Sequence, residues 1–463
     1  MIKLQHAKGK RFALFGLGSS GIATAKALQL GGAQVYVWDD QPSSREQAAK
    51  DGLQLVDLSQ ADFKEFDSFV LSPGVPLTFP KPHWSVEKAR AASVEIIGDI
   101  ELFCRERQKA APKSKLIAIT GTNGKSTTTA LTAHVLQRGG MQVQMGGNIG
   151  YPALALEMGN DKVFVLECSS YQIDLAPSLH PDVGILLNVS EDHLDRHGTI
   201  ENYAKAKERL ISGVVENGLA VVGVDDEWSK AIADRSKQRG IKTCEISVLK
   251  KLTEGIWLSG AQLVEKENCL IDLANCPSLP GRHNAQNAAA AFSAARFCGL
   301  AKEQIVAGMQ SFPGLVHRMQ RVGFIGKALL VNDSKATNAD AASKALASYK
   351  NIYWIAGGRP KTGGITSLKS FFPLIRHAYL IGEAANDFAQ TLKGQVPLDI
   401  AKTVEHAIEL AAKHTLKAPE PNPVILFSPA CASFDQFRNF EERGEAFCRY
   451  AKSQPGFIEI QKE

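Results

Sequence analysis

The segment from Gly121 to Thr127 reads Gly-Thr-Asn-Gly-Lys-Ser-Thr, a pattern that could hold a nucleoside triphosphate. Its glycines allow backbone amides to surround an anion, and Lys125 is placed to reach the terminal phosphates. The hydroxyl group of Ser126 or Thr127 could bind Mg²⁺. The standard pattern has its first glycine six positions before the lysine, where this chain has Ile119, so the loop is a shortened variant. An apolar run before the loop and a helical pattern after it favour phosphate binding over a structural turn.

A second glycine-rich segment, Gly16–Gly21, reads Gly-Leu-Gly-Ser-Ser-Gly and follows the apolar run 12–15. Asp39 and Asp40 come about 20 residues later, as in dinucleotide-binding folds. The arrangement could bind a diphosphate at a helix N-terminus, and a nicotinamide-dependent dehydrogenase is one interpretation. A tight strand-to-helix turn that binds no nucleotide is equally compatible with this motif.

Acidic and histidine side chains follow two further apolar runs. Glu167 ends the run 163–167, and a carboxylate at a strand end beside a phosphate loop commonly holds the metal of the nucleotide. His193 and His197 lie four residues apart, but Leu194 replaces the glutamate that H-E-x-x-H zinc hydrolases need, so we reject that site. One histidine near Mg²⁺ is the better interpretation. A structural histidine and a solvated glutamate remain the alternatives.

The chain alternates short apolar runs with helix-patterned segments, and most runs end in polar or glycine-rich loops. The expected buried strands are 12–15, 35–38, 116–120, 163–167, 183–188, 329–332, 352–356, 379–381 and 424–427. This alternation indicates an α/β protein with parallel sheets, in which ligands bind outside the carboxyl ends of the strands. Polar segments at 332–338, 357–361 and 428–433 follow the later runs, and their lysines could pair with phosphate or carboxylate oxygens.

Composition sets the broad class. At about 150 residues per domain, 463 residues suggest three domains, and 44% hydrophobic residues exclude a disordered chain. A net charge of +5, from 53 basic and 48 acidic residues, is too weak for a nucleic-acid binder. The eight cysteines are scattered without a C-x-x-C pair, which favours reduced thiols over disulfides or structural zinc. No run approaches the roughly 18 apolar residues of a membrane span. We therefore expect a cytoplasmic protein that binds neither membranes nor nucleic acids.

Taken together, the motifs resemble those of the Mur ligase family over essentially the full chain. The resemblance rests on the phosphate loop, 146–150, 167–172, 192–197, 281–287, His317-Arg318, 332–338 and 428–430. It implies an N-terminal Rossmann-like domain at 1–98 for a UDP substrate, a central P-loop ATPase-like domain at 99–314, and a C-terminal Rossmann-like domain at 315–463 for an amino acid. It also implies an ATP-dependent amide ligase of peptidoglycan precursor synthesis, acting through an acyl phosphate. The segments 72–74 and 433–440 favour the member that adds D-glutamate to UDP-N-acetylmuramoyl-L-alanine.

The resemblance further implies roles for individual residues. Those expected to act in catalysis are Lys125, Glu167, His193 and Lys207. Those expected to bind ATP are Gly121, Thr122, Asn123, Gly124, Lys125, Ser126, Thr127, Asn284, Asn287, Arg318, Asp333 and Lys335. Those expected to bind two Mg²⁺ ions are Ser126, Glu167, His193 and Lys207, the last as a CO₂ adduct (a carbamate). An unmodified ammonium group cannot bind Mg²⁺, whereas a carbamate is an anionic oxygen ligand. From the sequence alone, Lys205 or Lys207 could equally lie on a solvated helix face.

Two further sets concern the other substrates. The UDP substrate is expected to contact Ser19, Ser20, Asp39, Asp40, Ser72, Asn148, Ser169 and Gln172. The incoming amino acid is expected to contact Lys335, Thr337, Lys361, Ser433 and Phe434. Two lysines suit a substrate with two carboxylates. We also expect a monomer whose third domain closes on the second when ATP binds.

Three other functions remain possible at this stage. The first is another amide ligase on the same scaffold, either folylpolyglutamate synthase or a Mur ligase for a different amino acid. The N-terminal glycine loop argues against the folate enzyme. The second is a nicotinamide-dependent oxidoreductase, which would leave the phosphate loop, Glu167 and the 192–197 segment without a role. The third is a regulator that binds nucleotides without catalysis.

Overall fold

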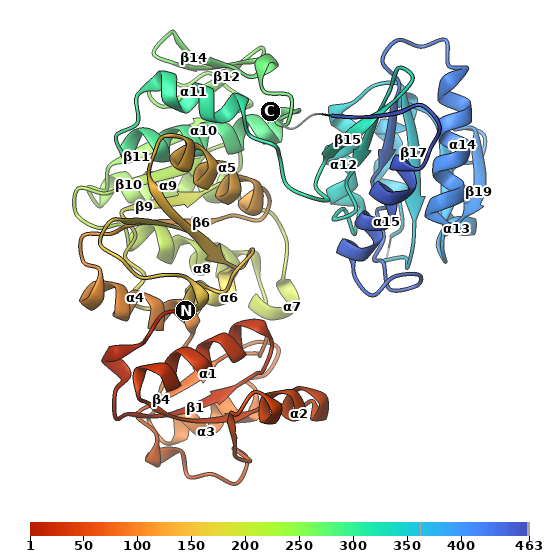
Figure 1. Cartoon of the computed structure of the whole chain (residues 1–463). Helices are drawn as coiled ribbons and strands as arrows, with labels where there is room; N and C mark the ends of the chain where they lie inside the picture. Colours follow the sequence, from red (N-terminus) through yellow and green to blue (C-terminus); the bar gives the residue numbers. More distant parts are fainter. Residues whose placement is uncertain (362, 461–463) are drawn as a thin grey trace. The chain divides into compact units, whose positions relative to one another are not determined.

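The structure is a computed structural model and describes residues 1–361 and 363–460 (Figure 1). The chain divides into two compact units. The first comprises Met1–Asn275 and Asn284–Gln310, and the second comprises Cys276–His283 and the chain from Ser311 onward. Three sheets lie within these units, two in the first and one in the second. The α/β architecture of three parallel-rich sheets expected from the sequence is confirmed.

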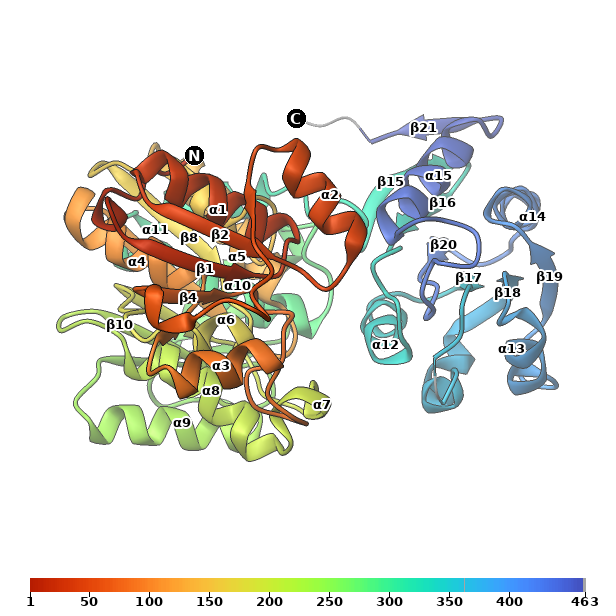
Figure 2. The same ribbon diagram turned by 90° about the horizontal axis from the view of Figure 1, so that it is seen from below.

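The N-terminal sheet has five parallel strands in the order β3-β2-β1-β4-β5. They are β1 (Arg11–Phe15), β2 (Gln34–Trp38), β3 (Gln54–Leu55), β4 (Ser68–Leu71) and β5 (Glu95–Ile97). The connecting helices are α1 (Ser19–Gly31), α2 (Pro42–Lys50) and α3 (Trp84–Ala91), with 3₁₀ turns η1 (Gln5–Ala7) and η2 (Phe63–Glu65). Side chains of β1 alternate between two cores, because Phe12 packs with α1 on one face and Phe15 packs with α3 on the other. Figure 2 shows α1 and α3 on opposite faces of this sheet.

The central sheet has nine strands in the order β14-β13-β12-β11-β10-β9-β6-β8-β7. Its strands are β6 (Lys115–Thr120), β7 (Gln142–Gly147), β8 (Lys162–Glu167), β9 (Val183–Leu186), β10 (Leu219–Gly223), β11 (Thr243–Ser247), β12 (Ile256–Ser259), β13 (Gln262–Glu265) and β14 (Asn268–Asp272). Its helices are α4 (Asp99–Ala110), α5 (Lys125–Arg138), α6 (Ser170–Asp174), α7 (Leu194–His197), α8 (Ile200–Ser212), α9 (Glu227–Gln238), α10 (Arg282–Phe297) and α11 (Lys302–Gln310), with turns η3 (Ala153–Ala155) and η4 (Leu273–Asn275). Strands β6 to β12 are parallel, so their carboxyl ends meet at one edge.

The sheet of the second unit has seven strands in the order β19-β18-β17-β20-β16-β15-β21. They are β15 (Gln320–Ile325), β16 (Ala328–Asn332), β17 (Ile352–Gly357), β18 (Ile375–Ile381), β19 (Leu398–Lys402), β20 (Val424–Phe427) and β21 (Phe457–Glu459). The helices are α12 (Ala339–Ser348), α13 (Ala385–Leu392), α14 (Val404–Leu416) and α15 (Phe440–Lys452), with turn η5 (Thr366–Leu374). Strands β15 and β21 pair antiparallel at one edge. Two apolar cores, one on each face, hold α12 and α13 against one side and α14 and α15 against the other (Figure 2).

The cysteines and the helix lengths agree with the composition. All eight cysteines are free thiols, as their spacing predicted. Within residues 1–361 and 363–460, every helix is too short or too polar to cross a bilayer.

The glycine turn after β1 depends on close packing between the turn and α1. Gly16 has a φ of +98°, and a Cβ added to Gly21 would lie 1.9 Å from the carbonyl oxygen of Gly16. Only glycine therefore fits at position 21, whether or not the turn binds a nucleotide. Gly18, at the N-cap of α1, has open space around its Cα.

We predict that Gly21→Ala destabilises the first unit by about 1–3 kcal/mol, because the added methyl group overpacks the turn. The matched control is Gly74→Ala, since Gly74 has no atom within 4 Å of an added Cβ and no positive φ. Chemical denaturation monitored by circular dichroism measures both changes. Equal stability of the two variants would contradict this account of the turn.

Candidate active site

The phosphate loop lies between β6 and α5 at the carboxyl edge of the central sheet (Figure 1). Gly121 and Gly124 have φ angles of +151° and +88°. A Cβ on Gly124 would lie 2.4 Å from Oδ1 of Asn287, so the glycine allows α10 to approach the loop. The backbone amides and the dipole at the N-terminus of a helix such as α5 favour an anion there.

Asn287 and Asn284 lie together on α10 beside this loop. Oδ1 of Asn287 accepts a hydrogen bond from the Thr128 hydroxyl group at 3.1 Å, and its Nδ2 donates to Oδ1 of Asn284 at 3.0 Å. Both side chains are buried. The structure thus brings two of the predicted ATP-binding residues against the loop.

Asn188, which follows β9, clamps the loop from the other side. Its Oδ1 accepts from the amide of Asn123 at 2.9 Å, while its Nδ2 donates to the Asn123 carbonyl at 3.2 Å and to Oε1 of Gln286 at 2.8 Å. The sequence analysis missed Asn188 and Gln286 as positioning residues. Asn188 could have been predicted as a site residue because it is the first polar residue after a buried strand.

Lys125 and Glu167 flank the loop with opposite charges. Nζ of Lys125 donates to the carbonyls of Gly121 and Thr122, at 2.9 Å in both cases. Glu167 ends β8, next to β6, and is only 2% exposed. Its Oε1 accepts from Nδ2 of Asn148 at 2.9 Å, but its buried Oε2 makes no hydrogen bond in the described part of the chain. A cation would satisfy this oxygen, so Glu167 suits a Mg²⁺ ligand.

Lys207 is buried on the inner face of α8, whereas Lys205 on the same helix is exposed. Nζ of Lys207 donates to the carbonyl of Gly121 at 3.0 Å and to the hydroxyl group of Thr120 at 3.3 Å. Burial, reinforced by the nearby charge of Lys125, holds the pKa of Lys207 well below its usual value. The structure therefore excludes a solvated face for Lys207 and places its amine at the phosphate loop.

The two histidines of the 192–197 segment differ in their surroundings. His193 has a left-handed φ of +54° before α7, and its side chain is 47% exposed. Its ring lies 5.2 Å from that of Tyr171. His197 is buried, with Nε2 2.9 Å from the hydroxyl oxygen of Ser170. Because Nε2 of His197 already pairs with Ser170, His193 is the better candidate of the two for a metal ligand.

An open cavity of about 460 Å³ lies where loops of the N-terminal and central sheets meet. It is lined by Gly16, Gly18, Ser19, Ser20, Asp39, Ser72, Pro73, Gly74, Val75, Gly147, Asn148, Gly150, Pro152 and Gln172. Six of the eight residues expected to contact the UDP substrate are among these, namely Ser19, Ser20, Asp39, Ser72, Asn148 and Gln172. The cavity is thus bordered by Gly18 and the N-terminus of α1, a position that could hold an anionic group.

The two remaining residues of that set do not line the cavity. Asp40 lies 3.1 Å from Nε2 of His83, and Ser169 caps α6 by accepting from the amide of Gln172 at 3.2 Å. Asp39 lines the cavity, but its carboxylate also accepts from the amide of Leu17 at 2.7 Å. Part of the role of Asp39 is therefore to hold the glycine turn.

Arg196 joins the two parts of the first unit beside this cavity. Its guanidinium group donates to the carbonyls of Pro73, Gly74 and Val75 and lies 4.5 Å above the ring of Tyr171. The sequence analysis quoted Arg196 only as part of a motif. Its bonds to a loop more than 100 residues away in the chain cannot be inferred from local spacing.

The second unit places its predicted residues at the carboxyl edge of its own sheet. Asp333 follows β16 and is buried, accepting from the Ser428 hydroxyl group at 2.8 Å and from the amide of Met319 at 3.1 Å. Burial raises the pKa of Asp333 to about 7. The other predicted residues of this unit differ in exposure: Arg318 and Thr337 are half-buried, Lys361 and Phe434 are exposed, and Ser433 is buried. Lys335 lies 4.8 Å above the ring of Phe440.

Comparison with known proteins decides the family. Residues 119–295 match the Mur ligase middle domain, and residues 317–431 match the domain described as Mur ligase, glutamate ligase domain. The chain is 55% identical to the UDP-N-acetylmuramoylalanine–D-glutamate ligase of Brucella suis biovar 1 (strain 1330), with 100% of both chains covered. The chain belongs to the Mur ligase family.

Other comparisons agree with this Mur ligase assignment. The enzyme of the same name from Agrobacterium fabrum (strain C58 / ATCC 33970) is 54% identical, with 96% of each chain covered. The crystal structure of UDP-N-acetylmuramate-alanine ligase MurC from Thermotoga maritima is 19% identical, covers 96% of this chain and 100% of its own, and has a TM-score of 0.58. At that identity the likeness concerns the fold alone. The family resemblance read from the sequence motifs is confirmed.

Arg443 on α15 is a buried positioning residue of this Mur ligase that the sequence analysis missed. Its guanidinium group donates to the carbonyls of Ser334, Cys431 and Ala432 at 2.8–3.2 Å, and Nε lies 3.1 Å from the Ser334 hydroxyl oxygen. One cation therefore joins the loop after β16 to the loop after β20. Burial lowers its pKa to about 10, which still leaves the side chain charged at neutral pH.

We predict that Arg443→Met destabilises the second unit of this Mur ligase by about 2–4 kcal/mol, because it leaves several buried carbonyls without a donor. Arg449→Met on the same helix is the matched control, since Arg449 is exposed. Denaturant unfolding followed by circular dichroism compares them. Similar unfolding midpoints for the two variants would show that Arg443 does not hold the loops.

We predict a pH-dependent stability that originates at Asp333. Its folded-state pKa of about 7 exceeds the ordinary value of 3.8, so its contribution is complete below pH 4 and is lost as pH rises toward 7. Asp333→Asn removes this titration. As pH rises from about 4 to 7, the unfolding free energy of wild type should therefore fall relative to that of the variant. A difference that is constant over this range would refute the buried, protonated carboxyl group.

Proposed function

We propose that this chain joins D-glutamate to UDP-N-acetylmuramoyl-L-alanine in an ATP-dependent reaction that releases ADP and phosphate. The reaction belongs to peptidoglycan precursor synthesis and proceeds through an acyl phosphate. One observation carries the proposal: Lys125, Lys207 and the half-satisfied Glu167 surround a phosphate loop at one sheet edge, in a chain similar over its full length to D-glutamate ligases.

We assign three functional parts to the chain. Residues 1–98 bind the UDP substrate, residues 99–314 bind ATP, and residues 315–463 bind the incoming amino acid, although residues 461–463 lie outside the described part. Free thiols throughout the chain support a reducing, cytoplasmic location. We propose a monomer, because all three substrates have candidate residues within one chain.

The proposed ATP-binding set is the one that the family resemblance implies. The loop residues Gly121 to Thr127 would surround the phosphates, while Asn284 and Asn287 would contact the nucleotide beside the loop. Arg318, Asp333 and Lys335 of the second unit complete the proposed set. The carbonyls that now accept from Lys125 would be replaced by phosphate oxygens, which are stronger acceptors for an ammonium group.

Members of this family use ATP with Mg²⁺, and the residues at the sheet edge fit that ion. Among the residues that the structure describes, Oε2 of Glu167 has no hydrogen-bond partner, and the Ser126 hydroxyl group lies at the start of α5 beside the loop. We propose two ions, the first held by Ser126 and Glu167 and the second by His193 and Lys207 as a carbamate. When bound, Mg²⁺ would neutralise charge on the phosphates and on the reacting carboxylate.

Burial of Lys207 supports its modification. Carbamate formation needs an uncharged amine as nucleophile, and the low pKa of Lys207 favours that form at neutral pH. The product would carry a negative charge beside the Lys125 ammonium group, whereas the unmodified cation faces it with like charge. The unmodified amine donates to oxygen atoms of Gly121 and Thr120.

The substrates supply two further sets of contacts. We propose that the six cavity-lining residues hold the UDP part. Asp40 and Ser169 do not line the cavity, so their contacts with the UDP substrate remain predictions. Lys335 and Lys361 are proposed to pair with the two carboxylates of glutamate, supported by Thr337, Ser433 and Phe434. The two lysine cations would balance the two carboxylates of glutamate, whereas a substrate with one carboxylate would leave one cation unbalanced.

The charges on the reacting groups must be neutralised for each step of the reaction to proceed. A carboxylate oxygen of the UDP substrate attacks the γ-phosphorus, and the bond to ADP breaks. Lys125 would neutralise charge on the transferring phosphoryl group, which otherwise repels the carboxylate. The uncharged amine of glutamate then attacks the acyl carbon and phosphate leaves. The nitrogen releases a proton as the amide forms.

The decisive experiment is a phosphate-release screen with UDP-N-acetylmuramoyl-L-alanine, ATP, Mg²⁺ and a panel of D- and L-amino acids. We predict release with D-glutamate, at a rate at least tenfold above that with L-glutamate or other amino acids. Release with a different amino acid would identify another ligase of the family. No release with any of them, or release without the UDP substrate, would contradict the proposal, and bound nicotinamide nucleotide in the purified protein would favour the oxidoreductase.

Substitution of the two α8 lysines tests the proposed role of Lys207. Lys207→Ala should lower turnover by at least about 100-fold, in the range seen when one electrostatic stabiliser is removed. Lys205→Ala is the matched control and should retain activity, because Lys205 is exposed to solvent. CO₂-depleted buffer should reduce wild-type activity, and added bicarbonate should restore it. Unchanged activity in CO₂-depleted buffer would argue against a carbamate.

A further inference from the structure

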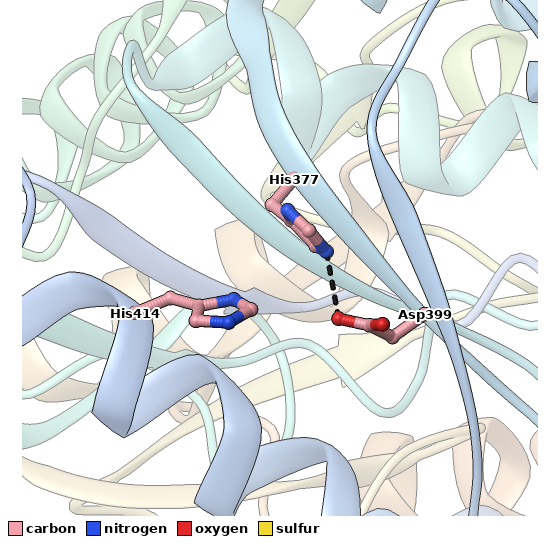
Figure 3. A group of neighbouring side chains, drawn as sticks. All are labelled: His377, Asp399 and His414. Carbon is pink, nitrogen blue, oxygen red and sulfur yellow. Dashed lines mark hydrogen bonds and ion pairs between the residues drawn. The ribbon is translucent and has the colours of Figure 1, made fainter.

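Two histidines and an aspartate converge in the second unit, outside the residues discussed so far. They are His377 on β18, Asp399 on β19 and His414 near the end of α14 (Figure 3). Each offers a ligand atom, and these atoms lie within 4.8 Å of one another. Within residues 1–361 and 363–460, this is the one group of three or more such side chains close enough to hold a metal ion.

The packing of the unit sets the position of these side chains. Tyr379 and Asp399 are partners in the parallel pairing of β18 with β19, and His377 lies two residues before Tyr379 on the same face. On that face, α14 packs into the apolar core through Ile408 and its neighbours. The three groups therefore come from three elements that one core holds together.

The group lies at the opposite edge of the sheet from the candidate ligase residues. His377 and Asp399 stand near the amino ends of parallel strands, whereas the loops at 333–337 and 428–433 follow carboxyl ends. Parallel strands place these two kinds of ends at opposite edges. The group is thus separate from the proposed ATP and glutamate contacts.

Hydrogen bonds already orient the rings. Nε2 of His377 lies 2.9 Å from Oδ2 of Asp399. Nδ1 of His414 lies 2.8 Å from the hydroxyl oxygen of the buried Tyr379, which fixes the plane of the ring. Nε2 of His414 makes no hydrogen bond to any residue that the structure describes. A second group that orients a histidine in this way is typical of metal sites.

We propose that His377, Asp399 and His414 bind one divalent transition-metal ion, of the class that accepts imidazole and carboxylate ligands together. Zinc is the ion of this class that two imidazoles, one carboxylate and a water molecule commonly bind. Ligand atoms around a tetrahedral zinc ion lie about 3.3 Å apart, so the three groups need only small side-chain movements. The ion would join α14 to β18 and β19.

Metal content after loading tests this site in the full-length protein. The protein is stripped with chelator, loaded with zinc sulfate and exchanged into metal-free buffer, and bound zinc is measured by mass spectrometry. Wild type should retain one zinc ion per chain more than Asp399→Asn and His414→Ala. The matched control His406→Ala should retain the wild-type amount, because His406 lies on the same helix and pairs with Glu409 instead. Equal zinc in all four proteins would overturn the proposal.

Two further measurements keep the test independent of how the variants fold. In wild type, zinc should shift the imidazole ring resonances of His377 and His414 and leave those of His406 unchanged. Unshifted resonances at positions 377 and 414 would overturn the site. Tyr379→Phe retains all three ligands, so it should bind zinc about 10–100-fold more weakly through loss of ring orientation alone. Ligation activity should be the same in all variants.

Discussion

The parallel pairing of β7, β8, β6 and β9 brings the carboxyl ends of four strands to one edge of the central sheet. Charged side chains that are largely shielded from solvent lie together at this edge. Glu167 and Lys207 are both almost fully buried there, and Lys125 folds onto the same loop carbonyls. Removing the charge of Glu167 from water costs several kcal/mol, which imperfect partners do not offset. Lys207 avoids the same cost because burial lowers the pKa of its amine. In the protein alone, the polar and charged groups at this edge are therefore not fully compensated by partners. A nucleotide and a cation would complete it, which is what a phosphoryl-transfer site requires.

The same edge also connects the two candidate substrate sites of the first unit. Asn148 lines the cavity and donates a hydrogen bond to Glu167, so the wall of one site is bonded to the proposed metal ligand of the other. Gly147 permits this contact, since a Cβ there would lie 2.3 Å from the carbonyl oxygen of Glu167. Arg196 holds the opposite side of the cavity. A reacting carboxylate can thus be positioned against the phosphates by groups that are hydrogen-bonded to one another.

The local sequence pattern was enough to predict the strands that end in site residues. Packing between residues far apart in the chain could not be predicted from it. The phosphate loop and Glu167 were predicted because each follows a buried apolar run. The sequence left Lys205 and Lys207 as alternatives, since only the packing of α8 determines which side chain is buried. Asn188 and Arg443 act on partners distant in the chain, and no spacing rule reveals such bonds. The strands that were not predicted are β3, β4, β5, β7, β10 to β15, β19 and β21. Several of them are short or only partly buried, but β4 and β10 are fully buried, largely apolar runs that the sequence pattern did not single out.

The central claim is that cations at this edge let a substrate carboxylate capture the terminal phosphoryl group of ATP. Oxygen transfer tests it most directly. UDP-N-acetylmuramoyl-L-alanine labelled with ¹⁸O in its terminal carboxylate is turned over with ATP and D-glutamate, and the released phosphate is analysed by mass spectrometry. The account predicts that each phosphate carries one oxygen from the substrate carboxylate. Unlabelled phosphate, released together with the amide product, would contradict it.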